Sequence, residues 1–168
     1  MPLKGGYTYQ NIARKKLKKG KSFAVNARWE IGADEEEGMA IITNGGTPEL
    51  VSIVAYTEDE DCLIYIIEDP DSYDEISGDL ILIDNNRKIK NDSVFEAKLV
   101  NNISGGENLG PNFFVDVEKA TPGRTAIGGF CSSTKPLILD NKTSYIIALE
   151  NQSGSNPTTV NLAVELFE

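Results

Sequence analysis

The side chains most often used for acid–base and nucleophilic chemistry are scarce in this sequence. Its 168 residues include no histidine, which removes the commonest general base and every Ser–His or Cys–His nucleophile pair. Cys62 and Cys131 have apolar or small neighbours and no CxxC spacing, so they are expected to be small core residues rather than zinc ligands or a disulfide framework. We therefore expect a protein that is not an enzyme and has no cofactor or metal.

Three acidic clusters are the candidate cation ligands, at residues 34–37, 58–61 and 68–75. Calcium requires about six to eight oxygen ligands that converge on one point, whereas consecutive acids in one turn diverge. The stretch 69–75 also lacks the central glycine of a calcium-binding loop. Solvated acidic loops are the favoured interpretation, and an ion site is the alternative.

The charges are distributed unevenly along the chain. Residues 1–28 carry +8 with no acid, and the whole chain carries −10, so the remainder carries −18. A basic segment on an acidic body is typical of an interaction tail. The acidic body would repel a nucleic-acid duplex, and no aromatic residues interleave with the lysines of residues 14–21. An acidic protein surface is the favoured partner, and a plain solvated helix face is the alternative.

The spacing of apolar residues within 7–20 predicts a short helix that ends at Gly20. A helix of this length is marginal alone in water, so it would order only against a surface. The residues expected to contact a partner are Tyr9, Ile12, Arg14, Lys15, Lys16, Leu17, Lys18 and Lys19.

After Gly20 the apolar period changes to two, which predicts strands. Strand-like runs rich in Val, Ile, Phe and Tyr occur at 23–28, 38–43, 50–56, 62–67, 80–83, 93–100, 113–117, 137–139, 144–150 and 158–167. Turn signals separate them, such as Asn44-Gly45-Gly46, Asp69-Pro70-Asp71, Gly105-Gly106 and Gly128-Gly129. We expect an all-β protein, an antiparallel β-sandwich of jelly-roll-like form, with a basic N-terminal arm over 1–22 and the sandwich domain over 23–168.

Two further features concern the surroundings of the protein. Residues 63–67 are apolar on both faces of the expected strand, which suits a central strand whose second face is covered, for example by a neighbouring subunit. The chain contains no apolar run long enough to span a bilayer and no secretory signal. We therefore expect synthesis in a cytoplasm and no contact with a membrane.

Several short motifs follow one another in a fixed order. They are Tyr9-Gln10-Asn11-Ile12, Gly20-Lys21-Ser22-Phe23, Thr43-Asn44-Gly45, Ile66-Ile67-Glu68-Asp69-Pro70, Asn85-Asn86-Arg87, Gly128-Gly129, the closing segment 139–154 with Tyr145-Ile146-Ile147 and Asn151-Gln152-Ser153-Gly154, and the terminal Phe167-Glu168. In this order the chain resembles a family of small head decoration or auxiliary capsid proteins of tailed bacteriophages. The closing segment is the most specific part.

The resemblance implies a structural virion protein, made in the host bacterial cytoplasm and located on the capsid surface. Its partner would be the major capsid protein or another virion protein, bound through the basic arm. A homo-oligomer, such as a trimer, would supply avidity and hide strand edges. Two alternatives are a tail or baseplate component and a carbohydrate-binding β-sandwich.

Overall fold

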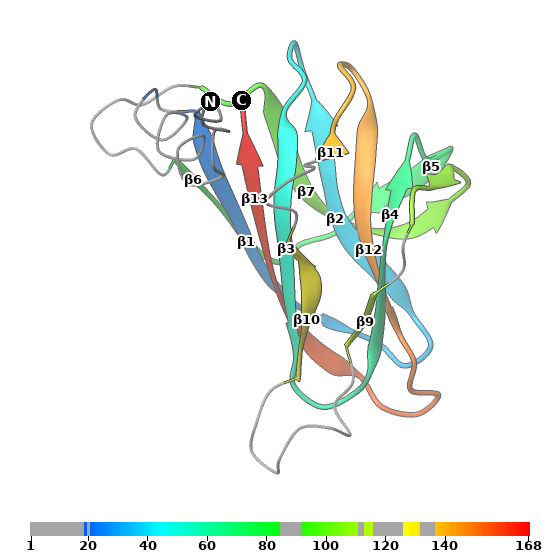
Figure 1. Cartoon of the computed structure of the whole chain (residues 1–168). Coiled ribbons are helices and arrows are strands. Elements are labelled where there is room, and N and C mark those ends of the chain that lie inside the picture. Colours follow the sequence, from blue (N-terminus) through cyan, green and yellow to red (C-terminus); the bar gives the residue numbers. More distant parts are fainter. Residues whose placement is uncertain (1–18, 20, 85–91, 111–112, 116–125, 132–136) are drawn as a thin grey trace, which may run out of the picture.

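The computed structural model describes residues 19, 21–84, 92–110, 113–115, 126–131 and 137–168 (Figure 1). This part of the chain is all-β and forms two antiparallel sheets, without a helix. The helix expected over residues 7–20 lies, apart from Lys19, outside the described residues, and the structure gives it no support. Among the described residues, no helix is long and apolar enough to cross a membrane.

The first sheet, sheet A, contains both ends of the described body. Its strand order is β10 (Ala126–Cys131), β3 (Glu49–Thr57), β13 (Thr158–Phe167), β1 (Ser22–Ile31) and β6 (Asp79–Asp84), with β11 (Leu137–Ile138) also paired to β3. β1 and β13 lie side by side in a continuous register that joins Ser22 to Phe167 and Ile31 to Thr158. The first and last strands therefore form the centre of sheet A.

The second sheet, sheet B, lies opposite sheet A (Figure 1). Its strand order is β5 (Ser72–Glu75), β7 (Phe95–Ser104), β2 (Glu36–Thr43), β12 (Ser144–Asn151), β4 (Cys62–Glu68) and β8 (Glu107–Asn108), with β9 (Phe113–Val115) also paired to β4. Successive long strands alternate between the sheets, because β1 and β3 lie in sheet A whereas β2 and β4 lie in sheet B. The short links between them therefore cross from one layer to the other.

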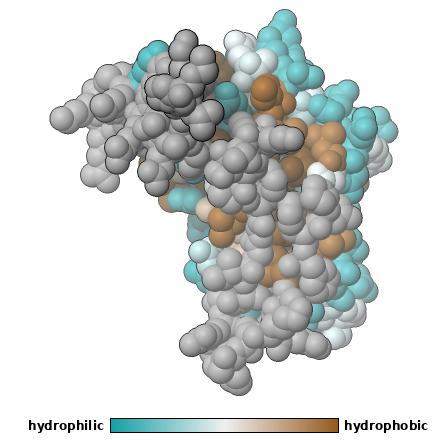
Figure 2. All heavy atoms as spheres, viewed as in Figure 1, coloured by the Kyte–Doolittle hydropathy of each residue, from teal (hydrophilic) through white to brown (hydrophobic). Residues whose placement is uncertain are grey.

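A single apolar core joins the two sheets. Val25, Ile53 and Leu162 of sheet A belong to the same buried cluster as Ile41 and Ile147 of sheet B. The burial patterns alternate along β1 and β13, as expected for strands with one face on a core. Hydrophobic residues also gather in the middle of the view in Figure 2, with hydrophilic residues at its margins. The arrangement is sandwich-like.

Sheet B carries a second, smaller core on its outer face. Ile67, Val100 and Ile146 are buried there, with Tyr65 and Ile103 packed against them. β7 lies on one side of the sheet, and its chain turns at Gly105-Gly106 into β8, which pairs with β4 on the other side. Tyr73 of β5 and Ile103 of β7 thus pack on the outer face of sheet B. The sequence had suggested that this face is covered, for example by a neighbouring subunit.

Most of the expected strands are present, but three assignments were wrong. Gly128-Gly129 was expected to be a turn, yet both residues lie inside β10, paired with β3. β5 and β8 were not predicted, because four and two residues are too few to establish a period. The turns at Asn44-Gly45-Gly46, Asp69-Pro70-Asp71 and Gly105-Gly106 are confirmed.

Candidate functional site

The outer face of sheet A carries a row of polar and aromatic side chains across four strands. Tyr56 on β3 pairs with Asn161 on β13, Asn161 pairs with Arg28 on β1, and Arg28 pairs with Asp79 on β6. Residues adjacent to Asn161 and Arg28 in sequence point into the core, so these four face outward. With strands about 4.8 Å apart, the row extends roughly 14 Å across the sheet.

The next row toward the start of β1 is smaller and more apolar. It consists of Val54, Ala163, Asn26 and Ile81 on the same four strands. Because Ala163 is short and its neighbours are long, the face is hollowed at this point. The hollow has a volume of about 270 Å³ and is lined by both rows, including Tyr56, Asn26 and Ile81.

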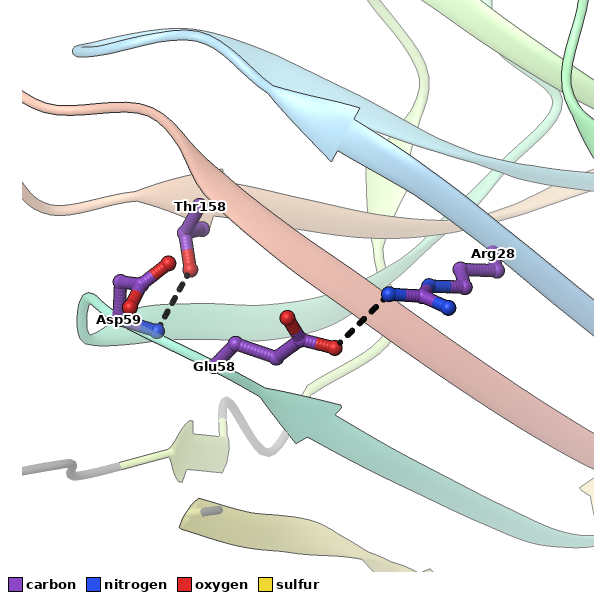
Figure 3. A network of polar contacts seen from close by, with 4 residues as sticks. All are labelled: Arg28, Glu58, Asp59 and Thr158. Carbon is purple, nitrogen blue, oxygen red and sulfur yellow. Dashed lines mark hydrogen bonds and ion pairs between the residues drawn. The ribbon is translucent and has the colours of Figure 1, made fainter. Parts of the chain in front are cut away.

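One ion pair closes the hollow toward the β3–β4 loop. The guanidinium Nη2 of Arg28 donates to Oε1 of Glu58 across β13, at 3.2 Å (Figure 3). The backbone N–H of Asp59 next to it donates to Oγ1 of Thr158 at 3.3 Å, which fixes the start of the loop. Both charged side chains of the pair are well exposed, so the pair contributes at most about 1 kcal/mol to stability. Among the described residues that line the hollow, Arg28 is the one cation, and the pair neutralises it.

Three polar groups of the hollow keep their hydrogen-bonding capacity. Within the described part of the chain, Asn26, Asn161 and Asp79 have no side-chain hydrogen bond or ion pair. The two amides offer donors and acceptors, and the Asp79 carboxylate offers acceptors. The hollow therefore presents an exposed aromatic ring, an apolar floor and free hydrogen-bonding groups of both kinds.

Almost all of the site residues expected from the sequence lie outside the residues that the structure describes. This holds for Tyr9, Ile12, Arg14, Lys15, Lys16, Leu17 and Lys18. Lys19 is described and is exposed in a turn before β1. None of the residues of the hollow was predicted, because Arg28, Tyr56 and Asn161 are far apart in the sequence and only the strand register brings them together.

The acidic clusters 34–37 and 58–61 meet at the end of the body where β1 stops. The backbone N–H of Asp34 donates to the carbonyl of Ser153 at 2.9 Å, and that of Gln152 donates to the carbonyl of Asp61 at 2.9 Å. The buried Asn151 joins these loops through its amide, which donates to the carbonyls of Gly32 and Asn156. Within the described ranges, no group of three or more acidic or cysteine side chains is arranged to hold a metal ion.

The opposite end of the body, where β1 begins, carries exposed apolar side chains. Leu82 and Ile83 are 42% and 41% exposed on β6, near the pairing of Phe23 with Asp84. Ile138 is 61% exposed on β11, which pairs with the start of β3. We call Leu82, Ile83 and Ile138 the apolar end residues. Leu82 and Ile83 point to opposite faces of β6, and Ile138 lies on β11 at the other edge of sheet A. All three lie at the end of the body that the basic N-terminal segment enters.

Two buried titratable groups, the Cys62 thiol and the Glu37 carboxyl, have pKa values that are raised chiefly by burial. The Cys62 thiol is fully buried, and burial with the nearby Asp61 and Glu60 charges raises its pKa to about 12, so it is a protonated core residue at neutral pH. Burial and the Glu35 charge raise the pKa of Glu37 to about 7, and the neighbouring Trp29 indole partly opposes this shift. Glu37 lies between the sheets at the acidic end.

No protein-family model, curated protein or solved structure matches this chain. The resemblance to head decoration proteins therefore stays a prediction.

Proposed function

We propose that this protein is a non-enzymatic structural component of a virus particle, attached to the outer surface of a tailed-phage head through its basic N-terminal segment. The strand order supports a jelly roll. When β5, β6, β7, β8 and β11 are set aside, the remaining strands of sheet A have the order β10-β3-β13-β1. They face the remaining strands of sheet B, in the order β2-β12-β4-β9. Jelly rolls are common in viral capsid and lectin domains, so the fold alone supports the assignment only by analogy.

The observation that carries the proposal is the basic charge of the N-terminal segment, which is attached to an acidic body. The basic segment, which has no acid before Glu30, enters at the end marked by Ser22, where Lys21 accepts a backbone hydrogen bond from Glu168. The acidic loops 34–37 and 58–61 lie at the other end, joined by the hydrogen bonds described above. The acidic cluster 68–75 lies at the Ser22 end, where Asp69 bonds to Ser144 at the start of β12. The attraction to an acidic shell would therefore come from the basic segment itself.

The apolar end residues supply the second part of the attachment. Exposed ion pairs contribute at most about 1 kcal/mol each, so lysines alone would hold the protein weakly. Leu82, Ile83 and Ile138 lie at the same end as the basic segment and can be buried against a shell protein or a second subunit. An oligomer, such as a trimer built at the β6 edge, would add avidity and cover that edge.

Replacing Lys15, Lys16, Lys18 and Lys19 together by Gln tests the attachment. Occupancy on purified particles should fall several-fold at about 0.15 M salt, because the charges that attract the shell are removed. The matched control replaces the same four residues by Arg, which keeps the charge and should keep the occupancy. The proposal fails if both variants occupy particles equally, or if deletion of residues 1–20 leaves occupancy unchanged.

A further inference from the structure

We infer that the hollow on the outer face of sheet A binds a neutral saccharide unit. This inference does not rest on the proposed attachment, because Leu82, Ile83 and Ile138 do not line the hollow. Its row Tyr56–Asn161–Arg28–Asp79 is near the other end of β1, and its floor residue Ala163 pairs with Asn26 in the middle of that strand.

The composition of the hollow favours a ligand with one apolar face and a rim of hydroxyl groups. The Tyr56 ring is 36% exposed and Ile81 is 60% exposed, so both offer apolar contact beside the small Ala163. A pyranose ring has C–H bonds on its faces and hydroxyl groups around its edge. The aromatic ring can pack against a sugar face while its own hydroxyl remains hydrated.

The polar side chains match the hydroxyl rim. Asn26 and Asn161 are neighbours across β1 and β13, on adjacent rows, and neither has a side-chain partner among the described residues. A planar amide or carboxylate can contact two adjacent hydroxyl groups, donating to one and accepting from the other in the case of an amide. Asp79 adds an acceptor at the far side of the row.

The charges exclude the main competing ligands. Arg28 is paired with Glu58, and Asp79 leaves the site with an excess of one negative charge, which disfavours phosphate, nucleic acid and acidic sugars. Within the described residues no group of three or more His, Cys, Asp or Glu side chains is arranged to hold a metal ion. The row of amide, guanidinium and carboxylate groups disfavours a purely apolar peptide, because burying those groups unpaired is costly.

The size of the hollow limits the ligand to one ring. Its volume, about 270 Å³, is close to the lower limit of ligand pockets, about 300 Å³. A single terminal sugar of a surface glycan fits this description better than an extended polymer. The expected affinity is weak, and copies on one particle would strengthen it through avidity.

The test is a titration of the full-length protein, followed by the NMR signals of backbone and Asn side-chain amides. The probes are methyl α-D-glucopyranoside, methyl α-D-mannopyranoside, methyl α-D-galactopyranoside and N-acetyl-D-glucosamine. We expect saturable shifts with at least one probe, including the side-chain amides of Asn26 and Asn161. Tyr56→Ala should weaken binding by about tenfold or more, because it removes the packing surface.

Ala163→Leu provides the sharper variant, since its side chain would fill the hollow. It should abolish binding, whereas Ala24→Leu, on the same face but outside the hollow, should retain it. Thermal unfolding curves confirm that each variant is folded. The inference is overturned if no neutral probe binds, if only acidic sugars bind, if Ala163→Leu still binds, or if that variant changes the oligomeric state instead.

Failure of the saccharide test and failure of the attachment are distinguishable. The lysine variants leave the hollow intact and should bind the sugar probes normally. Ala163→Leu leaves the basic segment intact and should occupy particles normally.

Discussion

Glu37 is the residue whose environment has the clearest energetic consequence. Its side chain is only 9% exposed, and its Oε2 atom has no hydrogen-bond partner among the described residues. A buried carboxyl in this position is more stable when protonated, which explains why its pKa rises from 4.5 to about 7. The charged form of Glu37 therefore destabilises the folded protein at neutral pH.

This environment predicts that stability falls as the pH rises. Between pH 4.5 and about 7, the folded state binds more protons at Glu37 than the unfolded state, so the free energy of unfolding decreases with increasing pH. Glu37→Gln removes this contribution and should make the protein more stable at pH 8 by on the order of 2 kcal/mol. Urea unfolding at pH 5 and pH 8 measures the difference.

Glu30→Gln is the matched control, because Glu30 is exposed on β1 beside Trp29. Glu36 and Glu165 also have pKa values raised chiefly by burial, so some pH dependence of the same sign remains in every variant. An equal pH dependence in the wild type and the Glu37→Gln variant would contradict this account of the buried carboxyl.

At the scale of the elements, the Gly105-Gly106 turn between β7 and β8 packs against Ile67 of the second core. Gly106 has a φ of +86°, and a Cβ atom there would lie 2.5 Å from Cγ2 of Ile67 and 2.8 Å from the carbonyl oxygen of Glu68. Only glycine satisfies both the backbone conformation and the close approach to β4. The turn therefore couples the β7–β8 link to the opposite side of sheet B.

Gly106→Ala should lower the free energy of unfolding by about 2–4 kcal/mol, through backbone strain and the clash with β4. Gly45→Ala is the matched control, because Gly45 has a φ of +106° but no atom within 4 Å of its Cβ position. It should cost only the strain, about 1–2 kcal/mol. Chemical denaturation of both variants measures the difference, and equal losses would show that the turn does not pack tightly on β4.

Sequence periodicity predicted the long strands of the body and the apolar second face of β4, since both depend on local patterns of two. It did not predict β10, because Gly128-Gly129 is a turn signal that only pairing with β3 overrides. The hollow was also missed. Tyr56, Asn161 and Asp79 share no local motif, and their proximity depends on the register of strands distant in sequence.

At the scale of the whole molecule, the basic N-terminal segment enters a body that is acidic at both ends. The end that it enters carries the apolar end residues and the acidic cluster 68–75, and the other end carries the acidic clusters 34–37 and 58–61. The long strands of both sheets run between these ends (Figure 1). If the basic segment binds an acidic surface, as proposed, the body would stand with the Ser22 end of β1 toward that surface and the clusters 34–37 and 58–61 toward solvent.

The most direct measurement is an electron cryomicroscopy map of purified particles of the phage that we propose to encode this chain. The account predicts density for the two-sheet body on the outer surface of the head, with the Ser22 end of β1 toward the shell and the loops 34–37 and 58–61 pointing outward. Density on the tail or baseplate, an inverted body, or particles that lack the protein would contradict it.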